Sequence, residues 1–295
     1  MASLGENRRG ALMMAAAMAA YTINDAFMKL VGEALPLFQA IMLRGLAITA
    51  ALLLLAWVTG GMRVRLAPGD GWKLVVRTVS EAAGAILFLS ALFNMSLANV
   101  TAILQTVPLM VTLGAALFLS ESVGWRRLTA VVAGFLGVLL IVRPGTEGFD
   151  AYSLLVLLSV VFLTLRDLVT RSMSGSVSAL MVAAAAAIGV TLVGAVGSVG
   201  QPWVPISPEV SFWLAGATLF AIAAYVLSIT AVRAGDMGFV APFRYSGLVW
   251  ALVLGFLVFG DWPDGLTILG AAVIVGAGLF TFARERKLAR ASAGG

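Results

Sequence analysis

The sequence contains no cysteine and no histidine among its 295 residues. These two absences exclude disulfides, thiol nucleophiles, imidazole bases and the usual zinc and haem ligands. Charged residues are also scarce, at 11% of the chain compared with roughly 25% in a soluble domain. Apolar residues make up 61%, and the mean hydropathy is +1.04. A chain with so little polar surface is predicted to be embedded in a membrane.

The motifs of most enzyme classes are also missing. Serine–histidine relays and HExxH zinc sites both need histidine, and the sequence has no glycine-rich nucleotide loop and no aspartate-rich phosphotransferase cluster. The formal net charge of +5 is explained by the basic cytoplasmic loops of a membrane protein rather than by nucleic-acid binding. We therefore predict no enzyme activity, no cofactor, no metal and no nucleic-acid partner.

The apolar residues fall into runs of about 20, which is the length that a helix needs to cross a bilayer. The first run is interpreted as a retained helix and not as a cleaved signal, because Asp25 and Lys29 follow it in place of a small-residue cleavage site. The predicted fold class is an all-α integral membrane protein with ten transmembrane helices. The predicted spans are 10–30, 36–58, 74–95, 99–119, 127–142, 151–170, 177–199, 211–232, 237–259 and 265–283.

The basic residues predict the orientation of these spans. With the N-terminus in the cytoplasm, Arg143 is the one basic residue in an outside loop, whereas 14 others lie at or near cytoplasmic ends, as the positive-inside rule requires. Both termini are therefore predicted to be cytoplasmic, with residues 284–295 as a basic tail. The 14 residues are Arg8, Arg9, Arg63, Arg65, Lys73, Arg77, Arg126, Arg127, Arg171, Arg233, Arg284, Arg286, Lys287 and Arg290.

The two halves of the chain share an ordered set of features at an offset that drifts around 137 to 140 residues. Each half has a proline inside its fourth helix, an acidic residue at the end of that helix and a glycine-rich fifth helix. The matching residues are Pro108, Glu121, Gly134 and Gly137 in the first half, and Pro242, Asp261, Gly270, Gly276 and Gly278 in the second. Because five is odd, the second repeat would be inserted upside down, a plan that recurs in secondary transporters. We predict two inverted repeats, residues 10–142 and 151–283.

Several short motifs carry a resemblance to a known family. They are Leu43-Arg44-Gly45, Leu97-Ala98-Asn99-Val100-Thr101-Ala102 with Pro108, Glu121 with Leu128-Thr129 and Gly134 to Gly137, and then Asp261, Leu266-Thr267 and Gly270 to Gly278. Together they resemble the drug/metabolite transporter superfamily, specifically ten-helix exporters of two EamA-type repeats and, within these, YddG-like amino-acid and metabolite exporters. The sequence departs from that pattern at Asp261, where Glu is typical, and at the Arg244-Tyr245 pair in the ninth helix.

The resemblance implies a multi-pass protein of the bacterial inner membrane. Its expected activity is secondary transport by alternating access, exporting a small polar metabolite, foremost amino acids. A broad-specificity drug or metabolite exporter of the same fold and a channel or scaffold protein are the alternatives.

Charged residues inside the spans are the first candidates for function, because a charge in hydrocarbon is costly unless it is paired or hydrated. Asp25, Lys29 and Arg44 lie at similar depth below the outer surface, where they form either a structural bridge or a gate or substrate contact. Arg77 and Glu81 form an i, i+4 pair in the third helix, at a depth similar to that of Arg244. A Glu81–Arg244 bridge that breaks during transport is one interpretation, and a static pair is the other.

Polar and aromatic residues at central depth complete the predicted substrate site. A zwitterion needs a cationic partner, an acceptor for its ammonium and an apolar wall, although these residues also occur in ordinary helix packing. The full set of predicted substrate residues is Asp25, Gln39, Arg44, Glu81, Asn94, Gln105, Tyr225, Arg244, Tyr245 and Trp250, and the gate or hinge residues are Lys29, Arg77, Pro108 and Pro242.

Small residues spaced four apart predict close helix contacts in the fifth and tenth spans. These are the pairs Ala133/Gly137 and Ala272/Gly276. We assign both spans to a scaffold or to a homodimer interface. The remaining predicted partners are the lipid bilayer and a small-molecule substrate.

Overall fold

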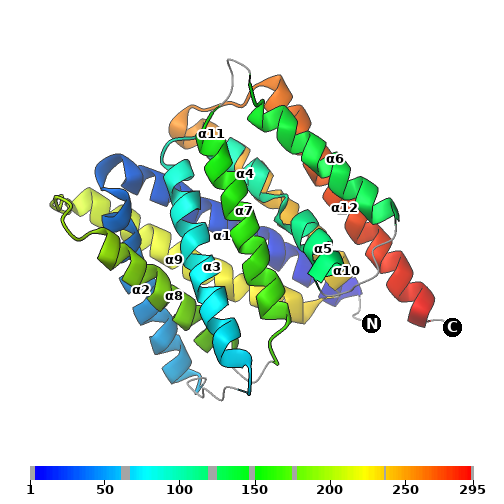
Figure 1. The fold of residues 1–295 in the computed structure, drawn as a ribbon, viewed down its shortest axis with the longest axis horizontal. Coiled ribbons are helices and arrows are strands. Elements are labelled where there is room, and N and C mark those ends of the chain that lie inside the picture. Colours follow the sequence, from blue (N-terminus) through cyan, green and yellow to red (C-terminus); the bar gives the residue numbers. More distant parts are fainter. Residues whose placement is uncertain are drawn as a thin grey trace. The chain divides into compact units, whose positions relative to one another are not determined.

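The computed structural model describes residues 4–60, 67–118, 125–145, 150–174, 178–235 and 237–293. The predicted feature at Glu121 and the side chains of Arg126, Arg127, Arg233 and the basic tail lie outside this description. The helices are α1 (Leu4–Ala34), α2 (Leu37–Val58), α3 (Asp70–Leu92), α4 (Leu97–Leu104), α5 (Val107–Phe118), α6 (Trp125–Val142), α7 (Tyr152–Arg171), α8 (Ala179–Gly197), α9 (Pro208–Ala234), α10 (Met237–Val240), the 3-10 helix η1 (Ala241–Tyr245), α11 (Ser246–Phe259) and α12 (Gly265–Ala293) (Figure 1).

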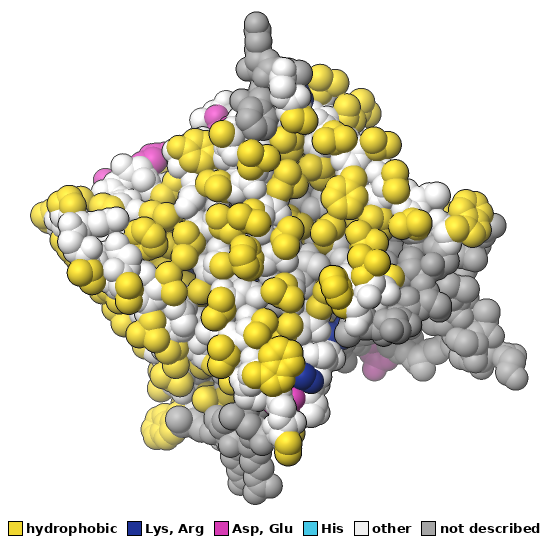
Figure 2. Space-filling view, viewed as in Figure 1, with side chains coloured by type: hydrophobic (Ala, Val, Ile, Leu, Met, Phe, Trp, Pro, Cys, Tyr) yellow, Lys and Arg dark blue, Asp and Glu magenta, His cyan; other side chains and the backbone are white. Residues whose placement is uncertain are grey.

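The predicted all-α membrane fold is confirmed. Within the described residues, nine helical stretches are long and apolar enough to cross a membrane, and the apolar part of α6, Leu128–Val142, is a shorter tenth. Hydrophobic side chains spread over the face shown in Figure 2, where few charged side chains are visible. Tryptophans lie exposed near helix ends, including Trp57, Trp72 and Trp125 at 69%, 61% and 70% exposure, where an aromatic belt is expected.

Local sequence signals explain several helix boundaries. Ser96 precedes α4 and accepts a hydrogen bond from the Asn99 N–H, and Ser178 does the same for α8 through the Met181 N–H. Such N-caps satisfy one of the N–H groups that a helix start leaves unpaired. At the other end of α11, Gly260 adopts a left-handed conformation with φ of 69°, which glycine adopts without steric cost.

The two predicted prolines both lie at helix interruptions, but not where the sequence placed them. The prediction of a kink inside a continuous fourth helix was wrong in detail, because α4 ends at Leu104 and Pro108 lies in the first turn of a new helix, α5. At that position the missing N–H of proline costs no helical hydrogen bond. Pro242 lies in η1, between α10 and α11.

Two helices are longer than their predicted spans. α1 begins at Leu4 instead of residue 10, and α12 continues through the predicted basic tail to Ala293. The tail is therefore a helical extension of the last span.

The chain divides into two compact units, each of which draws on both predicted repeats. Unit 1 comprises Met1–Ile23, Met95–Leu154 and Ala223–Gly295, and unit 2 comprises Asn24–Asn94 and Leu155–Ile222. Each unit is described by itself below.

In unit 1, α6 and α12 pack side by side in antiparallel directions (Figure 1). Arg143 at the end of α6 is bonded to Asp264 just before α12, and Gly137 further back on α6 faces Gly270 and Ile274. A Cβ atom on Gly137 would lie 2.7 Å from the carbonyl oxygen of Gly270, and one on Gly270 would lie 2.5 Å from that of Gly137. The two glycines therefore allow backbone-to-backbone contact.

The predicted small-residue pairs fare differently on these two helices. Gly137 makes the close contact expected of Ala133/Gly137. The prediction for Gly276 was wrong, because a Cβ atom there would meet nothing within 4 Å. Gly270, one turn and a half earlier on α12, takes the role assigned to Gly276, since it lies on the face that α6 covers.

In unit 2, α2 and α8 form a second antiparallel pair. Gly197 at the end of α8 lies against the ring of Phe38 near the start of α2, and Gly194 lies against the backbone of Met42. Further along, Thr49 and Thr191 are hydrogen-bonded at 3.3 Å. In unit 1, α4 packs along α11, and the amide of Gln105 at the end of α4 lies near Gly247 at the start of α11.

Candidate functional site

Unit 2 contains a buried polar link between α1 and α2. The Asn24 side chain is 2% exposed; its amide donates to Oδ1 of Asp25 at 2.8 Å, and its oxygen accepts from Nη2 of Arg44 at 3.1 Å. The predicted pairing of Asp25 with Arg44 is therefore realised through Asn24. Because the amide stands between the two charges, neither the carboxylate nor the guanidinium is fully used by the other.

Arg44 also has an unpaired hydrogen-bond donor. Its Nε atom is buried and has no hydrogen-bond partner in the structure. Burying an N–H without an acceptor costs roughly 1–3 kcal/mol, so this unpaired donor needs an explanation.

A second group of charges lies between α3 and α7. Glu81 is bonded to Nη1 of Arg166 at 3.1 Å and is 3.7 Å from Nη2 of Arg77, which confirms the i, i+4 contact with Arg77. Arg166 also binds its neighbour Asp167, with Nε 2.8 Å from the carboxylate. Glu81 acts electrostatically on Arg44 as well, which connects this group to the Asn24 link.

Together these side chains form a balanced set of six charges within unit 2. They are Asp25, Glu81 and Asp167 against Arg44, Arg77 and Arg166. Charges are tolerated inside a membrane when they are paired with one another or hydrated. The set therefore offers a polar interior that is neutral as a whole.

Polar contacts also join the rest of α3 to α7, and we call this row the polar seam. Ser174 binds the buried carboxylate of Asp70, Lys73 binds the carbonyl of Ser172, and Nε of Arg77 lies 3.1 Å from the Thr170 hydroxyl. The seam consists of Asp70, Lys73, Arg77 and Glu81 on α3 with Ser174, Ser172, Thr170 and Arg166 on or just after α7. The α3 residues recur every three or four positions, which places them on one helix face.

Two other predicted residues of unit 2 hold structure in place. Gln39 is 2% exposed, and its amide exchanges two hydrogen bonds with the backbone of Val204, at 2.8 and 3.0 Å. It therefore fixes the segment before α9 to the start of α2. Asn94 donates to the carbonyl of Ser90 one turn earlier, at the end of α3. Lys29 lies one turn after Asp25 on α1 and is half-buried.

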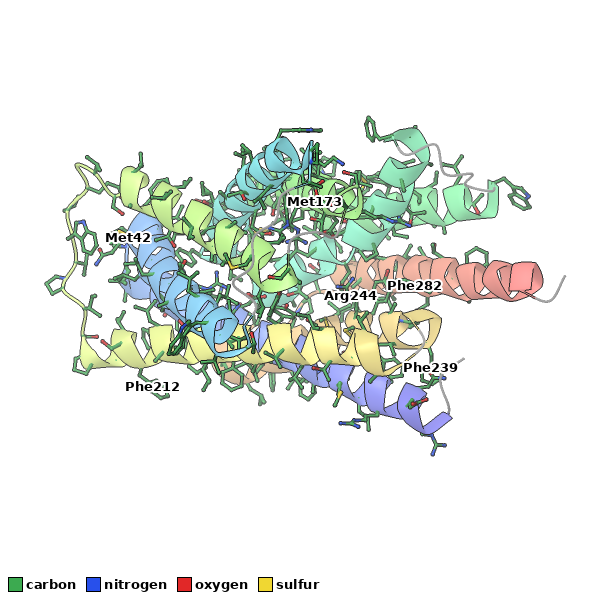
Figure 3. The ribbon with its side chains drawn as sticks, turned by 90° about the horizontal axis from the view of Figure 1, so that it is seen from below. Met42, Met173, Phe212, Phe239, Arg244 and Phe282 are labelled. Atoms are coloured by element: carbon green, nitrogen blue, oxygen red, sulfur yellow. The ribbon has the colours of Figure 1, made fainter. Side chains whose placement is uncertain are left out.

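The remaining predicted residues lie in unit 1. The Gln105 amide is 3.4 Å from the carbonyl oxygens of Arg244 and Tyr245. Tyr245 is buried, and its ring packs against that of Phe282 on α12. Figure 3 labels Arg244 and Phe282. The Arg244 side chain is exposed, and Trp250 is 39% exposed on α11. Because Arg244 and Glu81 belong to different units, their bridge stays a prediction.

An apolar cavity of about 260 Å³ lies in unit 1 beside Tyr245. Small side chains of α4 and α12 leave the space, with Ala98 and Ala271 among its walls, and Thr267 contributes a hydroxyl. Tyr225, on α9, is half-buried, and its carbonyl accepts from the Ser228 hydroxyl at 2.9 Å. Of the predicted site charges, unit 1 therefore holds Arg244, and the others lie in unit 2.

Three residues of this polar group were not among the predicted site residues: Asn24, Arg166 and Asp167. Asn24 has no charge and stood out only as a neighbour of Asp25. Arg166 lies near the end of a predicted span, yet it reaches Glu81 on another helix. The rule that marks charges within spans as functional candidates would have selected Arg166.

Comparison with known proteins gives the same class of protein as the fold and the charged interior, a multi-span membrane transporter. Residues 8–143 match the EamA-like transporter family. A riboflavin transporter of Rhizobium johnstonii is 31% identical over 74% of this chain and 72% of its own length, and one of Vibrio cholerae is 30% identical over 75% and 74%. The S-adenosylmethionine uptake transporter of Rickettsia prowazekii is 25% identical over 90% of each chain.

The chain belongs to the EamA-like transporter family of the drug/metabolite transporter superfamily. A protein crystal structure with a TM-score of 0.64 and 18% identity, covering 95% of this chain and 98% of that one, shares the fold. The chain is thus a secondary transporter of a small molecule in a bacterial multi-pass membrane family.

Proposed function

We propose that this transporter carries metabolites that bear an α-amino and a carboxylate group, and that Asp25, Asn24 and Arg44 bind that part of the substrate. The observation that carries the proposal is the buried Nε–H of Arg44, which has no acceptor and is separated from the Asp25 carboxylate by the Asn24 amide. A substrate carboxylate would accept from Arg44, and a substrate ammonium would donate to Asp25.

The balance of charge also favours a zwitterion. The six side chains of the charged set sum to zero, and a ligand carrying one positive and one negative group adds no net charge to them. Lys29, half-buried one turn after Asp25, lies outside this set. A simple anion or cation would bring an unbalanced charge into the membrane, where each costs several kcal/mol. Charge-assisted hydrogen bonds, about twice as strong as neutral ones, would hold both ends of a zwitterion.

The relatives are compatible with this substrate class in part. S-adenosylmethionine, named for the Rickettsia transporters, carries the same α-amino and carboxylate groups as an amino acid, but its sulfonium adds one further positive charge. Riboflavin, named for two other relatives, carries neither. The resemblance in sequence predicted export, and the Rickettsia proteins are named for uptake, so the proposed site is compatible with either direction.

We infer that transport proceeds by alternating access between two inverted repeats, residues 10–142 and 151–283. The spans that this division makes equivalent pack in pairs: α2 with α8, α6 with α12, and the fourth span with the ninth through α4 and α11. Equivalent residues should meet where a two-fold axis crosses such a pair. Gln105 contacts the carbonyls of Arg244 and Tyr245, which lie 139 and 140 residues later, and both offsets agree with the drift around 137 to 140 in the sequence.

The test is counterflow exchange in proteoliposomes. Neutral amino acids, their amides and esters, S-adenosylmethionine and riboflavin should be offered against a preloaded amino acid. Amino acids or S-adenosylmethionine should exchange, and blocking either charged group should abolish exchange. Arg44→Gln should weaken recognition of the carboxylate roughly ten- to hundredfold, since hydrogen bonds to charged groups contribute about 1.5–3 kcal/mol.

Arg143→Gln is the matched control, because it also removes a paired arginine, and Asp264, to which Arg143 is bonded, is not a residue of the proposed site. It should leave the ratio of amino acid to amide unchanged. Exchange of riboflavin without any amino acid, or equal exchange of acids and amides in both variants, would remove the zwitterion site.

A further inference from the structure

A row of aromatic contacts joins α1 to α9 in unit 2, and we call it the aromatic seam. The ring of Phe27 on α1 lies 5.9 Å from that of Phe212 and 6.1 Å from that of Phe220, both on α9. Gly216 lies between them, and a Cβ atom there would be 2.8 Å from the Phe27 ring. Phe212, Gly216 and Phe220 are spaced by four residues, so they lie on one side of α9, the side that meets Phe27. Figure 3 shows where Phe212 lies on α9.

The polar and aromatic seams occupy equivalent positions of the two inferred repeats. Gln105 contacts residues 139 and 140 positions later. The shift of 139 takes positions 73, 77 and 81 on α3 to 212, 216 and 220 on α9. The same shift takes position 27 on α1 to 166 on α7. The Glu81–Arg166 ion pair therefore corresponds to the Phe220–Phe27 ring contact.

The two seams lie toward opposite ends of unit 2. α1 ends at Ala34 and α2 begins at Leu37, so Phe27 lies within about two turns of the membrane side where α2 starts. α2 then crosses to the other side, where α3 starts at Asp70 and the polar seam begins. The aromatic seam therefore lies toward the membrane side where α2 starts, and the polar seam lies toward the side where α3 starts.

We propose that these seams are the two gates of the transport path, one ionic and one aromatic, and that Phe27 and Phe220 are gate residues equivalent to Arg166 and Glu81. This rests on the proposed alternating access. Opening the ionic gate separates charges that water and salt can solvate. Opening the aromatic gate exposes ring surface, which salt screening does not affect. The two half-cycles of transport therefore respond differently to ionic strength.

The chain lends itself to a test by thiol labelling, because it has no cysteine of its own. Ser159 is fully buried and donates to the carbonyl of Gly84, which follows Glu81 in α3, so it reports on the ionic gate. Ala217 is fully buried next to Gly216 in α9, so it reports on the aromatic gate. Single Ser159→Cys and Ala217→Cys reporters should be probed with a membrane-impermeant thiol reagent, in right-side-out and in inverted vesicles.

Glu81→Gln should raise the labelling rate at position 159 about tenfold, and only from the side where α3 begins. A tenfold change corresponds to a loss of about 1.4 kcal/mol in the free energy that favours the closed gate. High salt should act in the same direction at this position in the chain with Glu81 intact. Phe27→Ala should raise labelling at position 217, only from the opposite side, and salt should have no effect there.

Arg143→Gln, which breaks an ion pair outside both seams, should leave both reporters unchanged. Unaltered labelling in well-folded Glu81→Gln and Phe27→Ala proteins would show that the seams are static structural contacts. Increased labelling from both sides would show that the variants loosen the whole structure. Either result overturns the proposal. Labelling needs no substrate, so side-specific labelling without amino-acid exchange would refute the zwitterion site and leave the gates standing.

Discussion

The contact between Gly137 and Gly270 makes a sharp prediction about stability. Adding one methyl group as Gly137→Ala would place a Cβ atom 2.7 Å from the Gly270 oxygen and 2.9 Å from Cγ1 of Ile274. Both distances are well inside ordinary contact, so α6 and α12 have to move apart by a few tenths of an ångström or more. A gap of about 0.5–1 Å already removes a quarter to a half of the dispersion attraction along the interface.

Overpacking of this kind typically costs about 1–3 kcal/mol. Against it stands the better helix propensity of alanine, which favours the variant by up to about 1 kcal/mol. The matched control is Gly276→Ala on α12, where the new Cβ atom meets nothing within 4 Å. We expect Gly276→Ala to be neutral or slightly stabilising and Gly137→Ala to be destabilising by roughly 1–2 kcal/mol.

The assay is the unfolding midpoint of the purified protein in one detergent, followed for the parent and both variants. About 2–4 °C is expected per kcal/mol, by analogy with domains of 150–250 residues. Equal midpoints for Gly137→Ala and Gly276→Ala would refute the close contact, because both changes add the same methyl group to a helix.

Two further predictions concern the ends of the spans. Asp264 accepts from the Thr267 N–H and from Arg143, contacts that hold the pKa of its carboxyl below the ordinary value. This stabilisation is present above the ordinary carboxyl pKa of about 4 and is lost as pH falls through the lowered pKa. Removing the N-cap hydrogen bond in Asp264→Ala should cost about 0.5–2 kcal/mol at pH 7. The difference from the parent should disappear at pH values below the lowered pKa, as unfolding midpoints against pH would show. For topology, a cysteine at Pro205 should be labelled from outside intact cells and one at Ala67 should not; labelling of both from outside would contradict the ten-span orientation.

The sequence predicted the membrane fold well because its main signal is composition over whole spans. Runs of about 20 apolar residues mark helices whatever their neighbours are. Boundaries that depend on single residues were less certain, as α4 shows: Pro108 marked an interruption, but the N-cap and the position of the break relative to Pro108 depend on how the two short helices pack. The same holds for Gly276, whose spacing fits a helix contact although α6 covers a different face of α12.

The charged site could be predicted only in part. Asp25, Arg44, Arg77 and Glu81 were identifiable because a charge within a span is unusual on its own. Their connections were not, since Asn24 becomes important only when it is known to stand between Asp25 and Arg44. A phenylalanine in an apolar helix is still harder to identify as functional from the sequence. Phe27 becomes a candidate only when its ring contact is compared with the Glu81–Arg166 ion pair at the equivalent positions.

The length of α12 has a practical consequence. Its 29 residues extend over about 43 Å, whereas the hydrocarbon layer is about 30 Å thick. More than two helical turns therefore continue past the bilayer without a break. A rigid protein fused in helical register after Ala293 would keep a fixed orientation to the last span, and so could serve as an alignment marker for imaging a transporter that has no soluble domain in its described residues.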